Sequence, residues 1–228
     1  MTKDVLRDAA TAVVVNDSED QLQVLLLRRH QQLKVGGGHW VFPGGTVDPE
    51  DREAGEGEYA ARAAAIRETA EEASLSLPSE DLIFYSHWTT PPFTKRRFAT
   101  WFFIVDTEIR DVVVDGQEMD DYMWLSPADA VSRHRSGELA MMPPTVATLS
   151  ELSLCRNYTE VRRFGASRAV PHYRPRITDH QGRVCMLYPG DAGYDSADPS
   201  AEGPRNRSYM VAEGRWHYLS DWVDSELV

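Results

Sequence analysis

Three glutamates near the middle of the chain carry the clearest chemical signal in the sequence. Residues 58–73 are dense in alanine, glutamate and arginine and contain neither glycine nor proline, which predicts a helix. On that helix Glu68, Glu71 and Glu72 share one face, because residues three and four apart are neighbours. Their charges repel one another, and a hard divalent cation such as Mg²⁺ or Mn²⁺ would reverse that penalty. Arg67 is placed to pair with a neighbouring carboxylate. A solvated acidic helix face is the alternative interpretation.

A glycine turn upstream of this helix favours the chemical interpretation. Residues 40–42 form a short apolar run, which Pro43, Gly44 and Gly45 stop abruptly. Because glycine has no side chain, the backbone carbonyls of such a turn can approach a metal ion or a phosphate closely. The glutamates and the turn together therefore indicate a metal-dependent site that handles phosphate.

Together the two pieces resemble the signature of the Nudix hydrolases. That signature reads Gly, any five residues, Glu, any seven, then Arg-Glu-apolar-any-Glu-Glu-any-Gly-apolar. Residues 67–75 fit its second half, and residues 42–45 fit the approach to its first half. The helix-ending glycine of the signature is Ser74 here, so we expect a local adjustment at the end of the helix, since a left-handed serine costs about 1 kcal/mol.

The spacing between the two halves departs from the signature. Gly45 and Arg67 lie 22 positions apart where the signature has 14, so eight residues are inserted. Counted back from Arg67, the isolated glutamate of the signature falls on Tyr59. Its role is therefore either vacant or taken by Glu56 or Glu58.

A longer pattern is similar to one branch of the superfamily, which contains the peroxisomal acyl-coenzyme A diphosphatases and their bacterial relatives. Its pieces are residues 41–51, 66–72, 88–91, 97–103, 124–130 and 143–145. Residues 25–45 also partly resemble the extra motif of Nudix coenzyme A diphosphatases. However, Leu27, His30 and Gly36 stand where that motif prefers Thr, Ser and His. The resemblance covers residues 9–155 well and the rest loosely.

The resemblance implies divalent-metal-dependent hydrolysis of a pyrophosphate bond in a nucleoside diphosphate derivative, possibly coenzyme A or acyl-coenzyme A. It implies that Glu68 and Glu72 are the principal ligands of Mg²⁺ or Mn²⁺, with Glu71 and the Gly44 carbonyl as further ligands. Arg67 would orient a glutamate. ADP-ribose, a dinucleotide or a nucleoside triphosphate as substrate stays open, as does a catalytically silent domain that senses a nucleotide.

A further catalytic group is expected on a loop after the central strands. Nudix enzymes often take a base or an extra ligand from such a loop glutamate, and Glu118 directly precedes the predicted strand at residues 119–125. An ordinary exposed loop carboxylate is the alternative. The predicted catalytic residues are therefore Glu68, Glu72, Arg67 and Glu118.

Two basic clusters interrupt the acidic average of the chain. One contains Arg28 and Arg29, and the other contains Lys95, Arg96 and Arg97. Such cations could pair with the phosphates of the substrate. Salt bridges to nearby acids are equally open. Arg29 and Arg97 lie closest to the motifs of the resemblance, so they are favoured as substrate-binding residues, followed by Lys95 and Arg96.

Periodicity and turn residues predict an α+β fold. Strands are expected at residues 11–15, 22–29, 40–42, 82–89, 98–106 and 119–125, and further helices at 127–137 and 143–155. The resemblance makes this a Nudix-type α/β/α sandwich with a mixed central sheet and a C-terminal extension.

The chain divides into two expected parts. Residues 1–155 are predicted to be the Nudix domain, and residues 156–228 an extension packed on it, consisting of two hairpins, turning at 180–182 and 213–214, and a loop. Residues 48–57 carry five acids and two glycines, and we expect them to form a mobile flap beside the site.

Composition limits the partners. The 228 residues carry a net charge of −12, so phosphate backbones and anionic lipids would be repelled, and neither a nucleic acid nor a membrane is expected as a partner. Cys155 and Cys185 are too few for a disulfide framework, and a signal-like apolar core is missing from the first ten residues, which favours a cytoplasmic location. A small nucleoside diphosphate derivative is the expected partner, and a homodimer is possible, because family members often form dimers.

Overall fold

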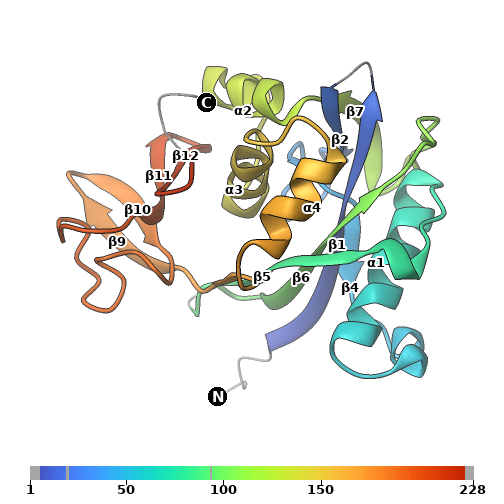
Figure 1. Ribbon diagram of the computed structural model, residues 1–228, viewed down its shortest axis with the longest axis horizontal. Coiled ribbons are helices and arrows are strands. Elements are labelled where there is room, and N and C mark those ends of the chain that lie inside the picture. The colour runs from blue at the N-terminus through green and yellow to red at the C-terminus, as the bar shows by residue number, and fades with distance from the viewer. Residues whose placement is uncertain (1–5, 19–20, 93, 224–228) are drawn as a thin grey trace.

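A mixed eight-stranded sheet forms the centre of the computed structural model, which describes residues 6–18, 21–92 and 94–223 (Figure 1). Its main path runs β3-β2-β1-β6-β5-β8, with β4 paired to β1 and β7 paired to β2. The strands are β1 (Leu6–Ser18), β2 (Gln21–Arg29), β3 (Trp40–Val41), β4 (Gly44–Thr46), β5 (Ile83–Thr89), β6 (Arg97–Asp106), β7 (Met119–Leu125) and β8 (His172–Tyr173). β1 pairs with β6 in parallel, and β5 pairs with β8 in parallel, whereas the other pairs are antiparallel.

Helices cover both faces of this sheet (Figure 1). The helices are α1 (Glu58–Ala73), α2 (Pro127–Ser136), α3 (Pro143–Leu152) and α4 (Tyr158–Ala166), with short 3₁₀ turns η1 (Glu50–Ala54) and η2 (Ser79–Asp81). α1 lies on one face and the other three helices lie on the opposite face. Two apolar clusters fill the layers, one under α1 and one between the sheet and α2 to α4. This is the predicted α+β sandwich with a mixed sheet.

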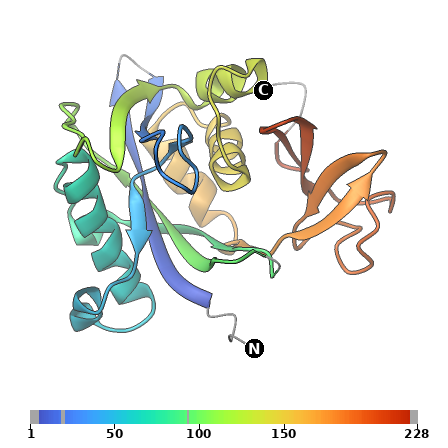
Figure 2. The same cartoon turned by 180° about the vertical axis from the view of Figure 1, so that it is seen from behind.

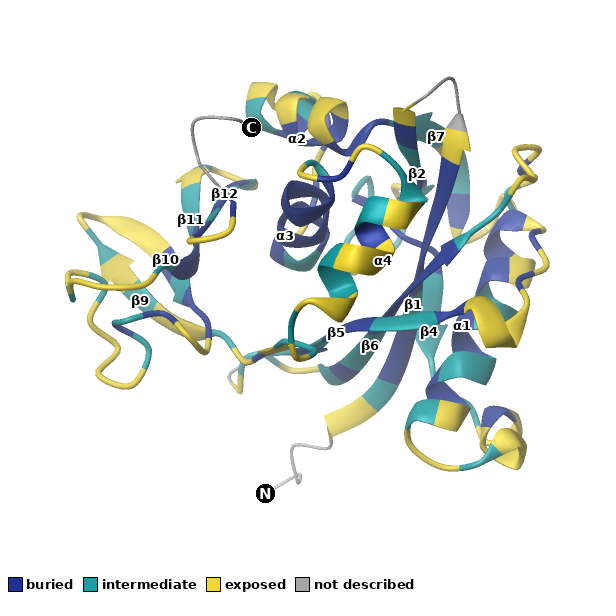
Figure 3. Ribbon diagram, viewed as in Figure 1, coloured by how far each residue is buried: buried dark blue, intermediate teal, exposed yellow. Residues whose placement is uncertain are grey.

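The inner face of α1 is made of alanines, which lets the helix approach the sheet closely. Ala61, Ala64 and Ala65 are fully buried against the small Ala10 and Ala12 of β1. Figure 3 shows α1 with buried and exposed residues in alternation along the helix. A small side chain on both surfaces shortens the distance between the two backbones, as close packing of interiors requires. This approach sets where the glutamates of α1 meet the sheet.

β1 changes partner along its length, and this opens the sheet beside the glycine turn. Residues 9–11 of β1 pair with β4, whereas residues 15–18 pair with β2. The chain between β3 and β4 passes through this junction. A Cβ on Gly44 would lie 2.3 Å from the carbonyl oxygen of Ala10, so a larger residue does not fit there.

α1 ends as the sequence suggested. Ser74 takes the left-handed conformation, with φ of 55°, and its N–H donates to the Ala70 carbonyl. Its hydroxyl donates to the carbonyl of Val113 at 3.0 Å. The hydrogen bond to Val113 helps to offset the cost of a left-handed residue that has a side chain.

The chain beyond residue 155 contains one helix and one strand that the sequence interpretation missed. Both predicted hairpins are present, in a four-stranded sheet of β9 (Arg176–His180), β10 (Arg183–Leu187), β11 (Asn206–Ala212) and β12 (Arg215–Ser220). α4 and β8 precede this sheet, and the expectation of hairpins and a loop alone was wrong. The available signal was Asn157, whose side chain accepts from the Glu160 N–H and caps α4.

Residues of the small sheet belong to the same apolar cluster as residues of α2 and α3. Figure 2 shows the small sheet on the side of the molecule where these two helices lie. Tyr173, Tyr188, Trp216 and Tyr218 belong to that cluster. None of the helices in the described part of the chain has both the length and the apolar character needed to span a bilayer.

A buried carboxylate joins α3 to the later elements. Glu151 is 1% exposed and accepts hydrogen bonds from Tyr85, Tyr173 and Trp222. It also forms a two-pronged pair with Arg168, at 2.9 and 2.7 Å. A buried charge is tolerated only when it is paired and hydrogen-bonded in this way.

We expect Glu151→Ala to lower the free energy of unfolding by about 3–5 kcal/mol, because it leaves the Arg168 charge and several buried donors without an acceptor. Urea unfolding followed by tryptophan fluorescence measures this. Glu151→Gln keeps an acceptor and should fall between the two proteins. An alanine variant within about 1 kcal/mol of wild type would show that the network is not needed for stability.

Candidate active site

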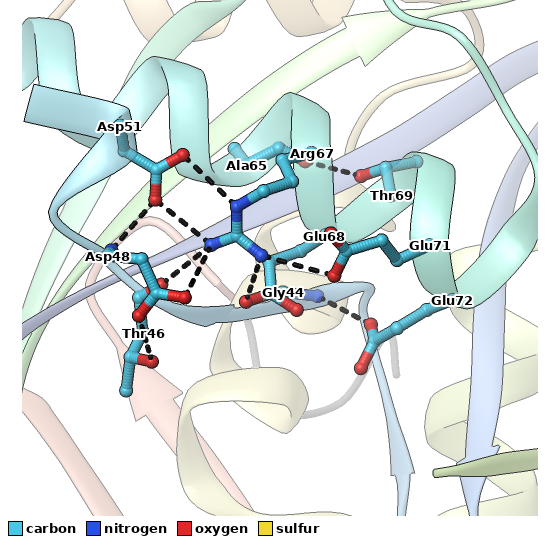
Figure 4. A network of polar contacts seen from close by, with 10 residues as sticks. All are labelled: Gly44, Thr46, Asp48, Asp51, Ala65, Arg67, Glu68, Thr69, Glu71 and Glu72. Atoms are coloured by element: carbon cyan, nitrogen blue, oxygen red, sulfur yellow. Dashed lines mark hydrogen bonds and ion pairs between the residues drawn. The ribbon is translucent and has the colours of Figure 1, made fainter. Parts of the chain in front are cut away.

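Glu72 is held directly against the glycine turn. Its Oε2 accepts the Gly44 N–H at 2.9 Å, and the residue is 5% exposed (Figure 4). Burial raises the pKa of Glu72 from 4.5 to about 8, although the Gly44 hydrogen bond acts in the opposite direction. The charges of Glu68 and Glu118 raise the pKa further, whereas that of Arg29 lowers it.

Glu68 occupies the space beside the second glycine. A Cβ on Gly45 would lie 2.2 Å from Oε1 of Glu68, so the carboxylate fits only because residue 45 has no side chain. Burial also raises the pKa of Glu68, while Arg67 lowers it. Glu71 lies on the outer side of the same helix face, and its side chain is 58% exposed.

Arg67 is the hub of the polar network (Figure 4). Its guanidinium donates to Glu68 at 3.0 Å, to Glu71 at 3.1 Å and to the carbonyl of Thr46 at 3.0 Å. Its other side is held by Asp51, through bonds of 3.1 and 2.9 Å. These carboxylates hold the pKa of Arg67 well above its usual value. The guanidinium therefore contacts both Glu68 and Glu71. That Arg67 orients a glutamate for catalysis stays a prediction.

Asp51 is a site residue that the sequence interpretation missed. It is 5% exposed, and it lies six positions after Gly45, which is where the signature places its isolated glutamate. Counting back from Arg67 along the signature places this glutamate at Tyr59 instead, with Glu56 or Glu58 as replacements. In the structure Glu56 pairs with Arg52 and Glu58 with Arg62, away from Arg67. Counting forward from the glycine would have found Asp51.

The eight extra residues therefore lie between Asp51 and Arg67, a stretch that contains the end of η1 and the start of α1. The segment at 48–57 had been expected to be a mobile flap. Its first half is instead η1, anchored by the Asp51–Arg67 pair and by the Asp48 N–H, which donates to Asp51. This half of the segment supports the site as part of the scaffold.

Arg29 and Glu118 lie close enough to the glutamates to act on them electrostatically. Their charges act on the pKa of Glu72, and that of Glu118 also acts on Glu68. β2 and β7 place them together, since Arg29 pairs with Met119 and the His30 N–H donates to the Glu118 carbonyl at 2.8 Å. Gly36, in the loop after β2, packs on the Arg29 side chain. The structure thus brings both predicted residues to the site.

The second basic cluster lies elsewhere. Arg97 starts β6 and pairs with Leu6, whereas Gly44 pairs with Thr11 of the same strand β1. Five residues of strand separate those positions by about 17 Å. Lys95 and Arg96 are exposed in the hairpin just before Arg97. As substrate-binding residues these three remain a prediction, and they could meet only a distant part of a long substrate.

The donor set suits a hard dication, but the carboxylates are turned inward. Among the described residues, no group of three or more His, Cys, Asp or Glu side chains is arranged as a metal cluster. Glu68 and Glu71 face Arg67, and Glu72 faces the Gly44 N–H. Two partly or fully buried carboxylates with raised pKa values, and a third acid nearby, are nevertheless the charge arrangement that a bound Mg²⁺ or Mn²⁺ would relieve.

The site consists of an acidic helix that lies against a glycine turn. Comparison with known proteins shows to which family a chain with this fold and this site belongs. Residues 5–143 match the NUDIX domain model. A crystal structure of a NUDIX hydrolase from Alicyclobacillus acidocaldarius superposes with a TM-score of 0.64 at 26% identity, covering 71% of this chain and 97% of that one. The chain belongs to the Nudix family, and the predicted class, a Nudix pyrophosphohydrolase, is confirmed.

Curated relatives carry the comparison further. Nudix hydrolase 7 of Caenorhabditis elegans is 25% identical over 208 residues, which cover 75% of this chain and 70% of the relative. The acyl-coenzyme A diphosphatases NUDT19 of Xenopus laevis and Gallus gallus are 27% and 28% identical and cover 59% and 53% of this chain. The matches span 40% and 34% of those two proteins, well under half of their length.

We expect Asp51→Asn to lower the free energy of unfolding by about 1.5–3 kcal/mol, because it weakens charge-assisted bonds that are shielded from water. Urea unfolding gives the value. Glu56→Gln is the matched control, since it removes an exposed carboxylate from Arg52 and should change stability by less than about 1 kcal/mol. Equal effects of the two substitutions would contradict the special place of Asp51.

Glu72→Gln should stabilise the metal-free protein increasingly as pH rises. A carboxyl whose pKa is raised on folding binds an extra proton in the folded state, so the wild type loses stability between pH 4.5 and about 8. Glutamine has no such proton and still accepts from Gly44. Thermal unfolding in EDTA across this range measures the difference, and Mg²⁺ should stabilise only the wild type. A difference that is constant with pH would refute this account.

Proposed function

We propose that this chain hydrolyses a pyrophosphate bond in a nucleoside diphosphate derivative, with Mg²⁺ or Mn²⁺ as cofactor and coenzyme A or acyl-coenzyme A as the first substrate to test. The observation that carries the reaction is the placement of Glu68 and Glu72 against the glycine turn at an electrostatic cost. The substrate class is supported by the relatives named acyl-coenzyme A diphosphatase.

The proposed metal ligands are Glu68, Glu71, Glu72 and the Gly44 carbonyl. A dication held there would polarise the phosphate oxygens and lower the pKa of a bound water. Glu68 and Glu71 bond to Arg67 in the structure, and as metal ligands they would give up part of that bonding, while Asp51 would keep Arg67 in place. Arg67 therefore fixes where the carboxylates are before and after binding.

Arg29 and Glu118 supply the remaining parts of the proposed reaction. Arg29, at the end of β2, pairs with the pyrophosphate oxygens. Glu118 accepts a proton from the attacking water, whose oxygen bonds to one phosphorus while the bridging P–O bond breaks and the electron pair leaves on the other phosphate. The charges of Arg29 and Glu118 both act on Glu72, which supports a position of both residues near the proposed metal and the pyrophosphate.

The test is a substrate panel with products identified by mass. Coenzyme A, an acyl-coenzyme A, ADP-ribose, NADH and diadenosine polyphosphates are incubated with the protein and Mg²⁺. We expect coenzyme A compounds to give the highest kcat/KM and to yield adenosine 3′,5′-bisphosphate and a phosphopantetheine.

Variants assign the roles. Glu72→Gln should lower kcat more than about 100-fold, and Glu118→Gln about 10²–10⁴-fold. Glu53→Gln, an exposed carboxylate in η1, is the control and should keep wild-type kcat. If wild type binds these compounds but turns over none of them, the nucleotide-sensing alternative replaces the enzyme. If it turns over only ADP-ribose or a dinucleotide, the reaction stands and the substrate assignment does not.

A further inference from the structure

A second group of chemically active side chains lies on the α1 face of the sheet, beyond the helix. His87 of β5 contacts Trp101 of β6 edge-on, with ring centroids 5.1 Å apart, and contacts His172 of β8 at 5.1 Å. Phe84 packs on Trp101 at 4.6 Å. We call His87, Trp101, His172 and the adjoining Arg174 the histidine patch.

The histidine patch is separated from the glutamates by α1. Gly45, Ala10, Trp101 and His87 are paired in one row across β4, β1, β6 and β5, so Gly45 and His87 lie about 14 Å apart at three strand spacings. α1 covers β1 between them. It presents Glu68 to β4 on one flank, and Arg62 over Phe103 of β6 on the other.

The histidine patch contains a cation, Arg174, against the acidic average of the chain. The ring of His87 is partly buried, and this burial, together with the charges of His172 and Arg174, lowers its pKa to about 4. Asp8 of β1 is the acid that acts in the opposite direction, and it is itself paired with Arg52. Arg174 is exposed and has no ion pair among the described residues. The positive charge of Arg174 favours an anion and opposes a metal cation at the two imidazoles.

His87 also lacks the bonding of a structural histidine. Its Nδ1 is shielded from water and has no hydrogen-bond partner within the described chain. His134, by contrast, is fully buried and uses both ring nitrogens, with the Leu139 carbonyl and the Trp216 N–H as partners. A polar ring kept in an apolar setting without such bonds is costly unless something else engages it.

We propose that His87, His172 and Arg174 form a second anion-binding site, which takes a phosphate monoester and holds its organic part along Trp101 and Phe84. The two imidazoles on β5 and β8, and Arg174 directly after β8, offer several donors, which suits the several oxygens of a phosphate group. The rings beside them give an apolar surface that a nucleobase can pack on. A bound anion would favour the protonated form of His87, because it offsets the charge of the imidazolium. The site does not depend on the proposed hydrolysis.

Imidazole NMR signals test this directly in the full chain, with EDTA present to keep metal from the glutamates. Inorganic phosphate and AMP are titrated separately. We expect saturable shifts of the His87 and His172 signals with both probes and a rise in the pKa of His87. AMP should bind at least about fivefold more tightly than phosphate, because stacking of the base adds to the anion contacts.

Arg174→Gln should weaken AMP binding about tenfold or more, since it removes a charged donor from an exposed position that does not support the core. Arg183→Gln is the matched control, because Arg183 is an exposed arginine on β10. Unmoved imidazole signals with both probes, or equal AMP affinity in the two variants, would overturn the proposal. So would shifts caused by Zn²⁺ but not by phosphate, because the imidazoles would then be a metal site.

Discussion

The close approach of α1 to the turn between β3 and β4 is the constraint on which the rest of the site depends. The approach is possible because the facing surfaces carry alanine on the helix and glycine on the turn. It brings the Glu72 carboxylate onto a backbone N–H and presses Glu68 against Gly45. Any methyl group added at this contact would move a carboxylate. Small residues here are therefore a requirement of the chemistry as much as of the packing.

The approach creates an electrostatic cost, and the Arg67–Asp51 pair limits it. Glu68, Glu71 and Glu72 crowd one helix face, and burial favours their protonated forms in the case of Glu68 and Glu72. Arg67 alone would be drawn toward whichever carboxylate was nearest. Because Asp51 grips its other side, the guanidinium is fixed in place and can share its donors between Glu68 and Glu71. The carboxylates are thus held in place and stay available as ligands for the proposed dication.

Local signals in the sequence predicted the parts of the fold that local chemistry determines. The glycine turn, the α1 helix with Ser74 at its left-handed end and the α2 helix that begins at Pro127 all depend on neighbouring residues. Local signals could not predict how strands that are distant in the sequence pair with one another. The separation of Arg97 from the glutamates follows from the pairing of β6 with β1, which no motif records. Asp51 was missed because the position of the insertion could not be read from the sequence. The arginines around α4 pointed to an irregular segment, although Asn157 is a typical residue to cap a helix.

The two flanks of α1 differ in charge. The start of the helix carries Arg62, which bonds to the Leu82 carbonyl and lies over the Phe103 ring of β6. Closer to its end the helix carries Glu68, which lies against Gly45 of β4. The helix therefore lies across the sheet with a carboxylate toward β4 on one side and a cation toward β6 on the other. A chain of net charge −12 can in this way keep the cation Arg174, beside β5 and β8, apart from the carboxylates on the other side of α1.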